Sequence, residues 1–250
     1  DMRSMKIDVN FAPVVDVNLH PDVNTIKDRS FGPDKNLVAD YGSAVMRGMQ
    51  DGGVVACAKH FPGHGDTEVD SHKALPVLKF PKERLDSVEL YPFRRLIKDG
   101  VEMVMVGHLL VPVLDTLPAS VSKVVVTDLL RKKMKFRGLI ITDALGMEGV
   151  LEPFGGSGAK ATLAAYKAGV DILLMPDNVS ESIDLIVDYI GDDRRKLKDL
   201  DARVSRVLAL KGKCGKLTGR DDLSVDPAAV DTKGTDALIT TIEETLAAGR

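Results

Sequence analysis

The stretch VVACAKHFPGHGD at residues 54–66 decides the fold class. Residues 54–58 are apolar without interruption, which is typical of a parallel strand that is covered on both faces. Charged and imidazole side chains begin directly afterwards, and Pro62, Gly63 and Gly65 favour a loop. The stretch therefore predicts a buried strand whose carboxyl end opens into a polar loop.

The same pattern of apolar strand, loop and amphipathic helix repeats along the chain. The predicted strands span residues 9–15, 54–58, 101–106, 139–142 and 170–175. The predicted helices span residues 36–49, 81–97, 128–135, 159–168, 180–190 and 197–210. Alternation of this kind predicts an α/β fold with a parallel sheet.

Several positions refine this prediction. The helix at 36–49 places Val38, Tyr41, Val45 and Met49 on one side, and Thr127 is the expected N-cap of the helix at 128–135. No G-x-G-x-x-G turn follows a strand, which disfavours a dinucleotide-binding sheet. A TIM-type (β/α)8 barrel fits better, and five strands make it incomplete. We expect a partial barrel domain over residues 1–210, followed by a linker and tail over 211–250 with a last helix near 235–248.

Composition narrows the classes of function. The chain has 250 residues, a net charge of −3 and both charge signs interspersed, which favours neither a nucleic-acid nor an anionic-membrane partner. No apolar run approaches the roughly 20 residues of a membrane span. The two cysteines indicate no disulfide framework and weakly favour a cytoplasmic location.

Titratable side chains gather behind the predicted strands. Asp16 and Asn18 follow the first strand, and His108 and Asp143 close the third and fourth. All five histidines lie just past strand ends, and the carboxyl ends of parallel strands form the rim that holds active sites. Clustered titratable groups at such a rim are candidates for function.

The densest cluster runs from Lys59 to His72 and contains a cation, three imidazoles and three carboxylates. Asp70 and His72 lie two residues apart, so the carboxylate can fix the imidazole tautomer. A paired carboxylate also raises the imidazole pKa, which allows a protonated histidine to donate a proton near neutral pH. We expect a His–Asp acid/base pair here.

Two further features allow two interpretations each. Asp143 at the tip of an apolar strand is suited to nucleophilic attack, and it is equally suited to cap the next helix. Arg29 can bind hydroxyl or carboxylate groups with two hydrogen bonds, or it can be a solvated loop residue. A metal site built from His60, His64, His72, His108 and Asp143 is a third possibility, although the spacing lacks an H-x-H or H-E-x-x-H pattern.

Taken together, these segments resemble glycoside hydrolase family 3, in particular its β-N-acetylglucosaminidase branch. Residues 59–72 match the K-H-F-P-G-H-G-x-T-x-x-D-S-H signature, and the segments at 10–18, 28–32, 104–108 and 141–147 follow in the expected order. The resemblance covers roughly residues 5 to 210. It implies a retaining enzyme that needs no metal or organic cofactor.

The resemblance also implies residue roles. Asp143 matches the nucleophile, His72 the acid/base and Asp70 its partner. Positions that bind the sugar are matched by Arg29, Lys59, His60, His108 and Met147. The family normally has two strands before residue 9, one with an Asp-x-Glu-Gly-Gly segment, so we expect an upstream segment to complete the barrel and this chain alone to be poorly active.

The expected function is release of terminal β-linked N-acetylglucosamine from peptidoglycan-derived or chitin-like oligosaccharides in a bacterium. The resemblance favours cell-wall recycling. The alternatives are a metal-dependent barrel hydrolase, a non-catalytic sugar-binding module, and a phosphorylase, because a histidine acid/base tolerates phosphate as the acceptor.

Overall fold

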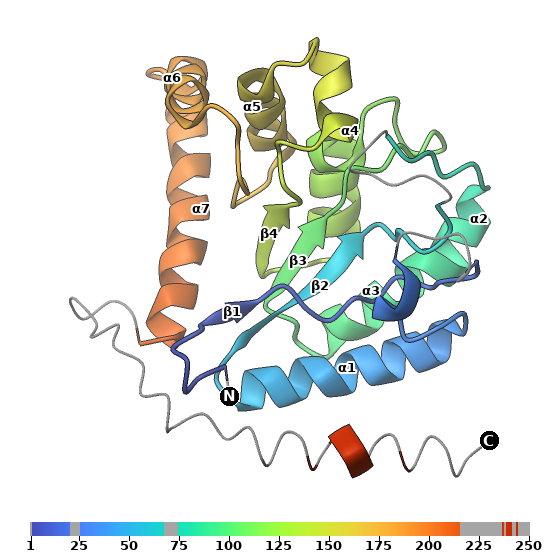
Figure 1. Cartoon of the computed structure of the whole chain (residues 1–250). Helices are drawn as coiled ribbons and strands as arrows, with labels where there is room; N and C mark the ends of the chain where they lie inside the picture. Colours follow the sequence, from blue (N-terminus) through green and yellow to red (C-terminus); the bar gives the residue numbers. More distant parts are fainter. Residues whose placement is uncertain are drawn as a thin grey trace.

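The computed structural model describes residues 2–20, 26–67 and 75–215, together with residues 237, 239–241 and 244 (Figure 1). Four parallel strands form one sheet in sequential order: β1 (Val9–Asn10), β2 (Val55–Phe61), β3 (Met103–Val106) and β4 (Leu139–Thr142). Beyond β4, a single parallel bridge joins Ile141 to Ile172 and adds the next segment of chain.

Helices connect the strands. The longer ones are α1 (Lys35–Asp51), α3 (Leu90–Lys98), the π-helix η4 (Val124–Lys133), α5 (Gly158–Ala168), α6 (Val179–Ile190) and α7 (Arg194–Lys213). The short ones are η1 (Lys27–Arg29), α2 (Lys82–Arg84), the π-turn η2 (Leu85–Glu89), η3 (Ala119–Val121), α4 (Glu148–Leu151) and η5 (Glu152–Phe154). Asp34, Ser157, Asn178 and Asp193 accept backbone N–H groups as N-caps of α1, α5, α6 and α7, which explains where these four helices begin.

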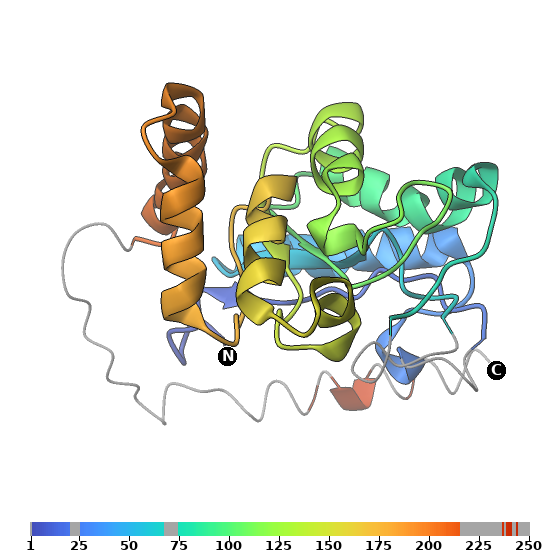
Figure 2. The same cartoon turned by 90° about the horizontal axis from the view of Figure 1, so that it is seen from above.

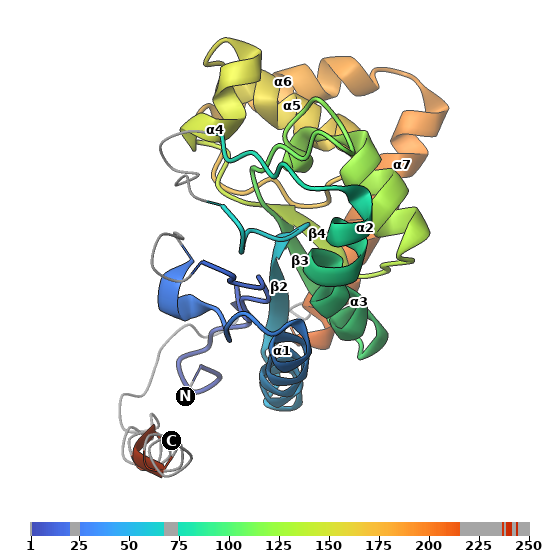
Figure 3. The same ribbon diagram turned by 90° about the vertical axis from the view of Figure 1, so that its right-hand side faces the viewer.

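The two faces of the sheet bury different residues. Side chains alternate along each strand, so Ala56, Val104 and Ile140 join the larger core under α1, α3 and η4. Their neighbours form a second apolar cluster on the opposite face: Val55, Cys57, Met103, Met105, Leu139 and Ile141. Burial on both faces accounts for the uninterrupted apolar runs in the sequence. Figure 3 shows α2 and α3 on one side of the sheet and η1 on the other.

Helix α7 covers part of the second cluster. Val207, Leu210 and Cys214, at the end of this helix, pack against it. At the middle of the helix, Arg206 binds Asp171 at 2.6 Å, and Asp171 also binds Arg131 at 2.6 Å. Figure 2 shows α6 and α7 at the end of the molecule opposite α2.

The strand order identifies the architecture. Each crossover leads to the next neighbouring strand, whereas a doubly wound sheet reverses direction at a switch point. Successive parallel strands with helices between them are the arrangement of a (β/α)8 barrel. The described strands form an open sheet in this order, as predicted for an α/β barrel that is incomplete in this chain.

Three predictions on local structure are corrected. The segment 170–175 pairs through one bridge only and forms no named strand. Thr127 is no N-cap, because η4 begins three residues earlier and the Thr127 hydroxyl donates to the Ala168 carbonyl at 2.6 Å. On α1, Tyr41 and Val45 are exposed. The buried face of α1 consists of Val38, Ala39, Gly42, Ser43 and Met46.

At the end of the chain, α7 continues to Lys213, and residues 237, 239–241 and 244 of the predicted last helix are helical. The division at residue 210 stays a prediction. Among the described residues, no helix is long and apolar enough to cross a bilayer.

Candidate active site

Asp143 lies directly behind β4 and is held by backbone contacts. Its N–H donates to the Val106 carbonyl at 2.9 Å, which extends the β3–β4 ladder by one residue. The side-chain Oδ1 accepts the N–H of Ala144 at 2.9 Å. The next helix, α4, begins after Met147, so Asp143 does not cap it. Of the two interpretations of Asp143, the helix cap is therefore wrong.

His60 lies beside Asp143 and is fixed by Asp16. The distance from His60 Nε2 to Asp143 Oδ2 is 4.0 Å, and the Asp143 side chain is 22% exposed. On the other side of the ring, His60 Nδ1 lies 2.8 Å from Asp16 Oδ2. Because an ionised carboxylate can only accept, Nδ1 carries the proton and donates it. Nε2 therefore faces the space next to Asp143.

Asp16 is a completely buried carboxylate. Besides the His60 ring, it accepts the backbone N–H groups of His60 at 3.0 Å and His64 at 2.7 Å. Burial acts to raise the pKa of Asp16, but the attraction of His60 and His64 and their hydrogen bonds outweigh it and hold this pKa below its usual value. Asp16 is thus ionised at neutral pH and joins the segment after β1 to the loop after β2.

The loop after β2 is packed tightly against the same segment. A Cβ atom on Gly65 would lie 2.0 Å from the Val17 carbonyl oxygen, so only glycine fits there. The Thr67 hydroxyl donates to the His64 carbonyl at 3.0 Å and lies 2.6 Å from His64 Nδ1. It therefore accepts from Nδ1–H, which fixes the His64 tautomer. Burial lowers the pKa of His64, and Asp16 offsets part of this effect.

His108 supports the backbone next to Asp143. Its Nε2 donates to the Ala144 carbonyl at 2.8 Å, and Nδ1 lies 2.7 Å from the Ser120 hydroxyl. The ring is buried and both nitrogens are used. Met147 is buried, and its N–H donates to the Ala144 carbonyl at 3.1 Å. In this conformation His108 positions the chain behind the nucleophile candidate, and a direct contact of His108 or Met147 with substrate stays a prediction.

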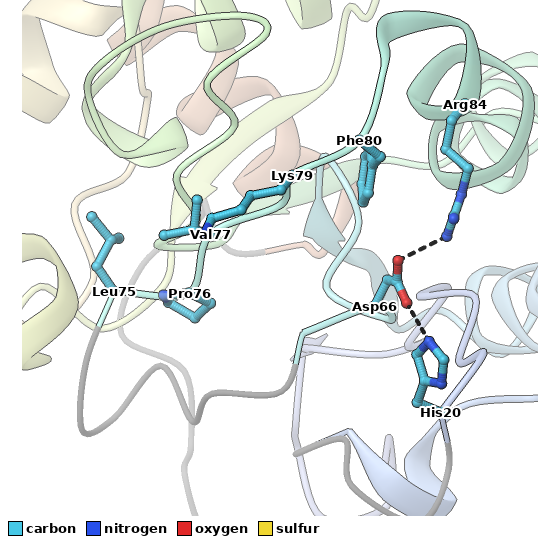
Figure 4. Close-up of a pocket in the computed structure, with 8 residues that line it drawn as sticks. All are labelled: His20, Asp66, Leu75, Pro76, Val77, Lys79, Phe80 and Arg84. Atoms are coloured by element: carbon cyan, nitrogen blue, oxygen red, sulfur yellow. Dashed lines mark hydrogen bonds and ion pairs between the residues drawn. The ribbon is translucent and has the colours of Figure 1, made fainter.

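A cavity of about 470 Å³ lies at the end of the loop after β2 (Figure 4). Its polar wall contains Asp66, which lies 3.0 Å from His20 Nε2 and forms an ion pair with Arg84 at 2.9 Å. The opposite wall is formed by residues 75–77, which pair with Leu110 just beyond His108. The cavity therefore borders both the β2 and the β3 ends of the rim.

Of the four remaining predicted site residues, the structure describes two. Asp70 and His72 lie outside the described residues, so their geometry is not tested. Lys59 lies in β2, forms a single parallel bridge with Val14 and is half-buried. Arg29 is exposed on η1. Their predicted contacts with sugar hydroxyls stay predictions.

The described residues contain no group of three histidine, cysteine or carboxylate side chains that could hold a metal ion. For the described histidines of the predicted metal set, the protein partners of the ring nitrogens explain this absence. His108 is bound to Ser120 and Ala144, His64 to Thr67, and His60 to Asp16. These rings are fixed by protein partners in different directions.

The family model described as glycosyl hydrolase family 3 N terminal domain matches residues 1–210. The chain belongs to this family. The membership confirms the family resemblance that the motifs indicate, and it agrees with the barrel-like order of the strands.

Family 3 relatives are similar along most of the chain. A β-hexosaminidase A from Pseudoalteromonas piscicida is 34% identical over 85% of this chain and 39% of its own length. A β-hexosaminidase from Hydrogenovibrio crunogenus is 38% identical over 70% of this chain and 48% of its own length. Among solved structures, a glycoside hydrolase family 3 β-N-acetylglucosaminidase from Paenibacillus sp. is 36% identical with a TM-score of 0.85, covering 94% of this chain and 45% of that one. The chain thus spans about half the length of these relatives or less.

Sequence reasoning found the strand-end cluster but missed several residues that shape it. The sequence indicates Asp16 only as a polar residue behind a strand, and its local pattern assigns no role to Thr67, Arg84 or Glu89. The contacts of Asp16 join positions 44 and 48 residues apart, so no local pattern reveals them.

Proposed function

We propose that this chain is the catalytic part of a retaining glycoside hydrolase that releases terminal β-linked N-acetylglucosamine. The observation that carries the proposal is the pair formed by Asp143 and His60. A carboxylate fixed at the tip of a buried strand faces an imidazole whose tautomer is set by a buried aspartate. Membership of family 3 and the β-hexosaminidase relatives support the same conclusion.

In the proposed reaction, Asp143 Oδ2 attacks the anomeric carbon while His72 donates its proton to the leaving oxygen. The aglycone departs as an alcohol, and the sugar is bound to Asp143 as an ester. Neutral His72 then takes a proton from water, whose oxygen attacks the anomeric carbon and releases Asp143 as a carboxylate. Two inversions retain the anomeric configuration.

The surrounding residues prepare this chemistry. The Ala144 N–H holds Asp143 Oδ1, which leaves Oδ2 for attack. His60 Nε2 lies close enough to Oδ2 for both to contact one bound sugar, and Arg29 and Lys59 supply further donors to its hydroxyls. Asp70 keeps the His72 imidazole oriented and favours its protonated form.

The proposed substrates are peptidoglycan-derived or chitin-like oligosaccharides, and the proposed setting is bacterial cell-wall recycling in the cytoplasm. The N-acetylglucosamine preference rests on the D-S-H motif at residues 70–72 and on the names of the relatives.

The test compares an aryl β-N-acetylglucosaminide with the corresponding β-glucoside, using the full-length protein. We expect hydrolysis of the first only, and no turnover by Asp143→Ala. General acid–base catalysis contributes roughly 10²–10⁴-fold, so His72→Ala should lose about that much on an alkyl glycoside and far less on an activated aryl glycoside.

Four results would contradict the proposal. Normal activity in Asp143→Ala would exclude this carboxylate as the nucleophile. Loss of wild-type activity in a strong chelator would favour the metal-dependent alternative, and binding of N-acetylglucosamine without turnover would favour a binding module. Release of sugar phosphate in phosphate buffer would identify a phosphorylase instead of a hydrolase.

A further inference from the structure

Arg84 and Asp66 form an ion pair outside the residues that the proposed mechanism uses. Arg84 Nη2 binds Asp66 Oδ2 at 2.9 Å, and the Asp66 side chain is only 15% exposed (Figure 4). His20 Nε2 binds the other oxygen of Asp66 at 3.0 Å. Both carboxylate oxygens of Asp66 are therefore held by partners from different parts of the chain.

Glu89 fixes Arg84 from the protein interior. Glu89 Oε1 accepts from Arg84 Nε at 3.2 Å and from Nη2 at 3.0 Å, and its side chain is 1% exposed. The guanidinium also lies over the Phe80 ring, 5.0 Å from its centroid. Arg84 thus presents Nη2 to Asp66 from a fixed position, held by a buried carboxylate and an aromatic face.

Glu89 also supports the loop after β2. Gly63 has a φ of +129°, and a Cβ atom on it would lie 2.7 Å from Cβ of Glu89. The Glu89 side chain therefore packs directly beneath the loop that begins at Pro62. Asp66 lies at the other end of this loop, four residues before Asp70 and six before His72.

We propose that Arg84 is a positioning residue, which anchors Asp66 and thereby places the segment that carries Asp70 and His72 relative to Asp143. The inference rests on the proposed function, since it assigns a role to His72. Arg84 affects the steps in which His72 transfers a proton. The attack by Asp143 depends instead on the contacts behind β4, which hold its carboxylate. Glu89 positions Arg84 in turn.

A matched control lies on the same helical segment. Arg94 on α3 binds Asp86 at 2.6 Å, and both residues lie within this segment, away from the loop. Its side chain is 40% exposed and that of Arg84 is 31% exposed, so the two guanidinium groups are similarly accessible, although Arg84→Gln also removes the cation beside the buried Glu89. Only Arg84 binds the loop.

The kinetic test compares Arg84→Gln, Arg84→Lys and Arg94→Gln in the full-length protein, with an alkyl and an activated aryl β-N-acetylglucosaminide. Supporting groups of this kind are worth 10- to 100-fold, so we expect kcat of Arg84→Gln to fall by about that factor on the alkyl glycoside and by less than about 3-fold on the aryl glycoside. The alkaline limb of its pH profile, which reports loss of the proton from the general acid, should also move. Arg84→Lys should recover part of the loss, and Arg94→Gln should match the wild type.

An equal loss on both glycosides, or no loss on either, would overturn the proposal, because a merely structural arginine does not distinguish leaving groups. A wild type that cleaves neither glycoside counts against the proposed function, and a measurement without substrate then decides the role of Arg84. Hydrogen exchange in residues 62–74 should be about ten times faster in Arg84→Gln than in Arg94→Gln, as expected for a local opening that costs less free energy. Equal exchange in the two variants overturns the anchor.

Discussion

At the scale of single residues, the site depends on Asp16, a buried carboxylate that binds groups of the protein itself. Asp16 is buried beneath two histidines and decides which nitrogen of His60 faces Asp143. The position of Asp16 behind a strand could be read from the sequence. Its three donors could not, because they meet only when the segment after β1 packs against the loop after β2.

Asp16→Asn tests this role. The amide oxygen can still accept the two backbone N–H groups, but the NH₂ group then faces His60 Nδ1 and forces the opposite tautomer. Loss of a hydrogen bond that orients a histidine of the site costs about 10- to 100-fold, so we expect kcat/KM to fall by about that factor. ¹⁵N NMR of the His60 ring should show the proton on Nε2.

Asp40→Asn is the control for this variant, because its side chain is 59% exposed and its ion pair with Arg95 lies at the surface. Such pairs contribute about 0–1 kcal/mol, so activity and tautomer should stay unchanged in the control. An Asp16→Asn enzyme with wild-type kinetics would show that the His60 tautomer is irrelevant to the reaction.

At the scale of elements, the predictions succeeded where one pattern dominates. The strand at 139–142 is apolar throughout and was predicted with its observed bounds, and α5 begins one residue before the predicted start. The predictions failed where packing overrides local preference. Val124 to Val126 are β-branched and disfavour a helix, yet Val125 and Val126 are buried and η4 includes them. On α1, small residues occupy the middle of the buried face, because Gly42 lies against Val15.

The attachment of α7 depends on Asp171, whose side chain is completely buried. Its oxygens accept from Arg131, Arg206 and the Ile140 N–H. Removing one partner of a buried ion pair costs about 3–5 kcal/mol, and the partial exposure of both arginines places Asp171→Ala near the lower end of this range. Urea unfolding monitored by circular dichroism measures the loss.

Asp188→Ala on the exposed surface of α6 is the matched control, for which we expect a change within about 0.5 kcal/mol. In Asp171→Ala the end of α7 should also loosen from the second apolar cluster, which binding of a hydrophobic dye would detect. Equal stability of the two variants would contradict the anchoring role of Asp171.

At the scale of the whole molecule, the sequence predicted the class of fold, because alternating strands and helices with apolar runs allow few arrangements. It also predicted which edge of the sheet carries the polar residues. It did not predict how α7 covers the second face, because the apolar positions of a helix do not specify which of two sheet faces it meets.

Stability should fall in acid in two stages. The pKa of buried His64 lies below its value of about 6.5 in the unfolded chain. Between these two values the unfolded chain binds more protons, so the free energy of unfolding decreases as the pH falls below about 6.5. Asp16, whose pKa is also lowered, adds a loss that begins below about 3.8.

Urea unfolding at pH 7.5 and pH 5 measures the first stage. We expect His64→Asn, which keeps a donor to Thr67, to show a smaller difference between the two pH values than the wild type. An identical difference in both proteins would mean that His64 takes up its proton equally in the folded and unfolded chain.

The burial of β2 on both faces has a practical consequence for labelling. Cys57 is enclosed in that strand, and burial raises the pKa of its thiol far above the usual value, so it reacts with maleimides only after unfolding. Cys214 is half-buried at the end of α7. A fluorophore can therefore be attached at that one position without engineering the protein, and its emission will report whether the helix end rests on the sheet.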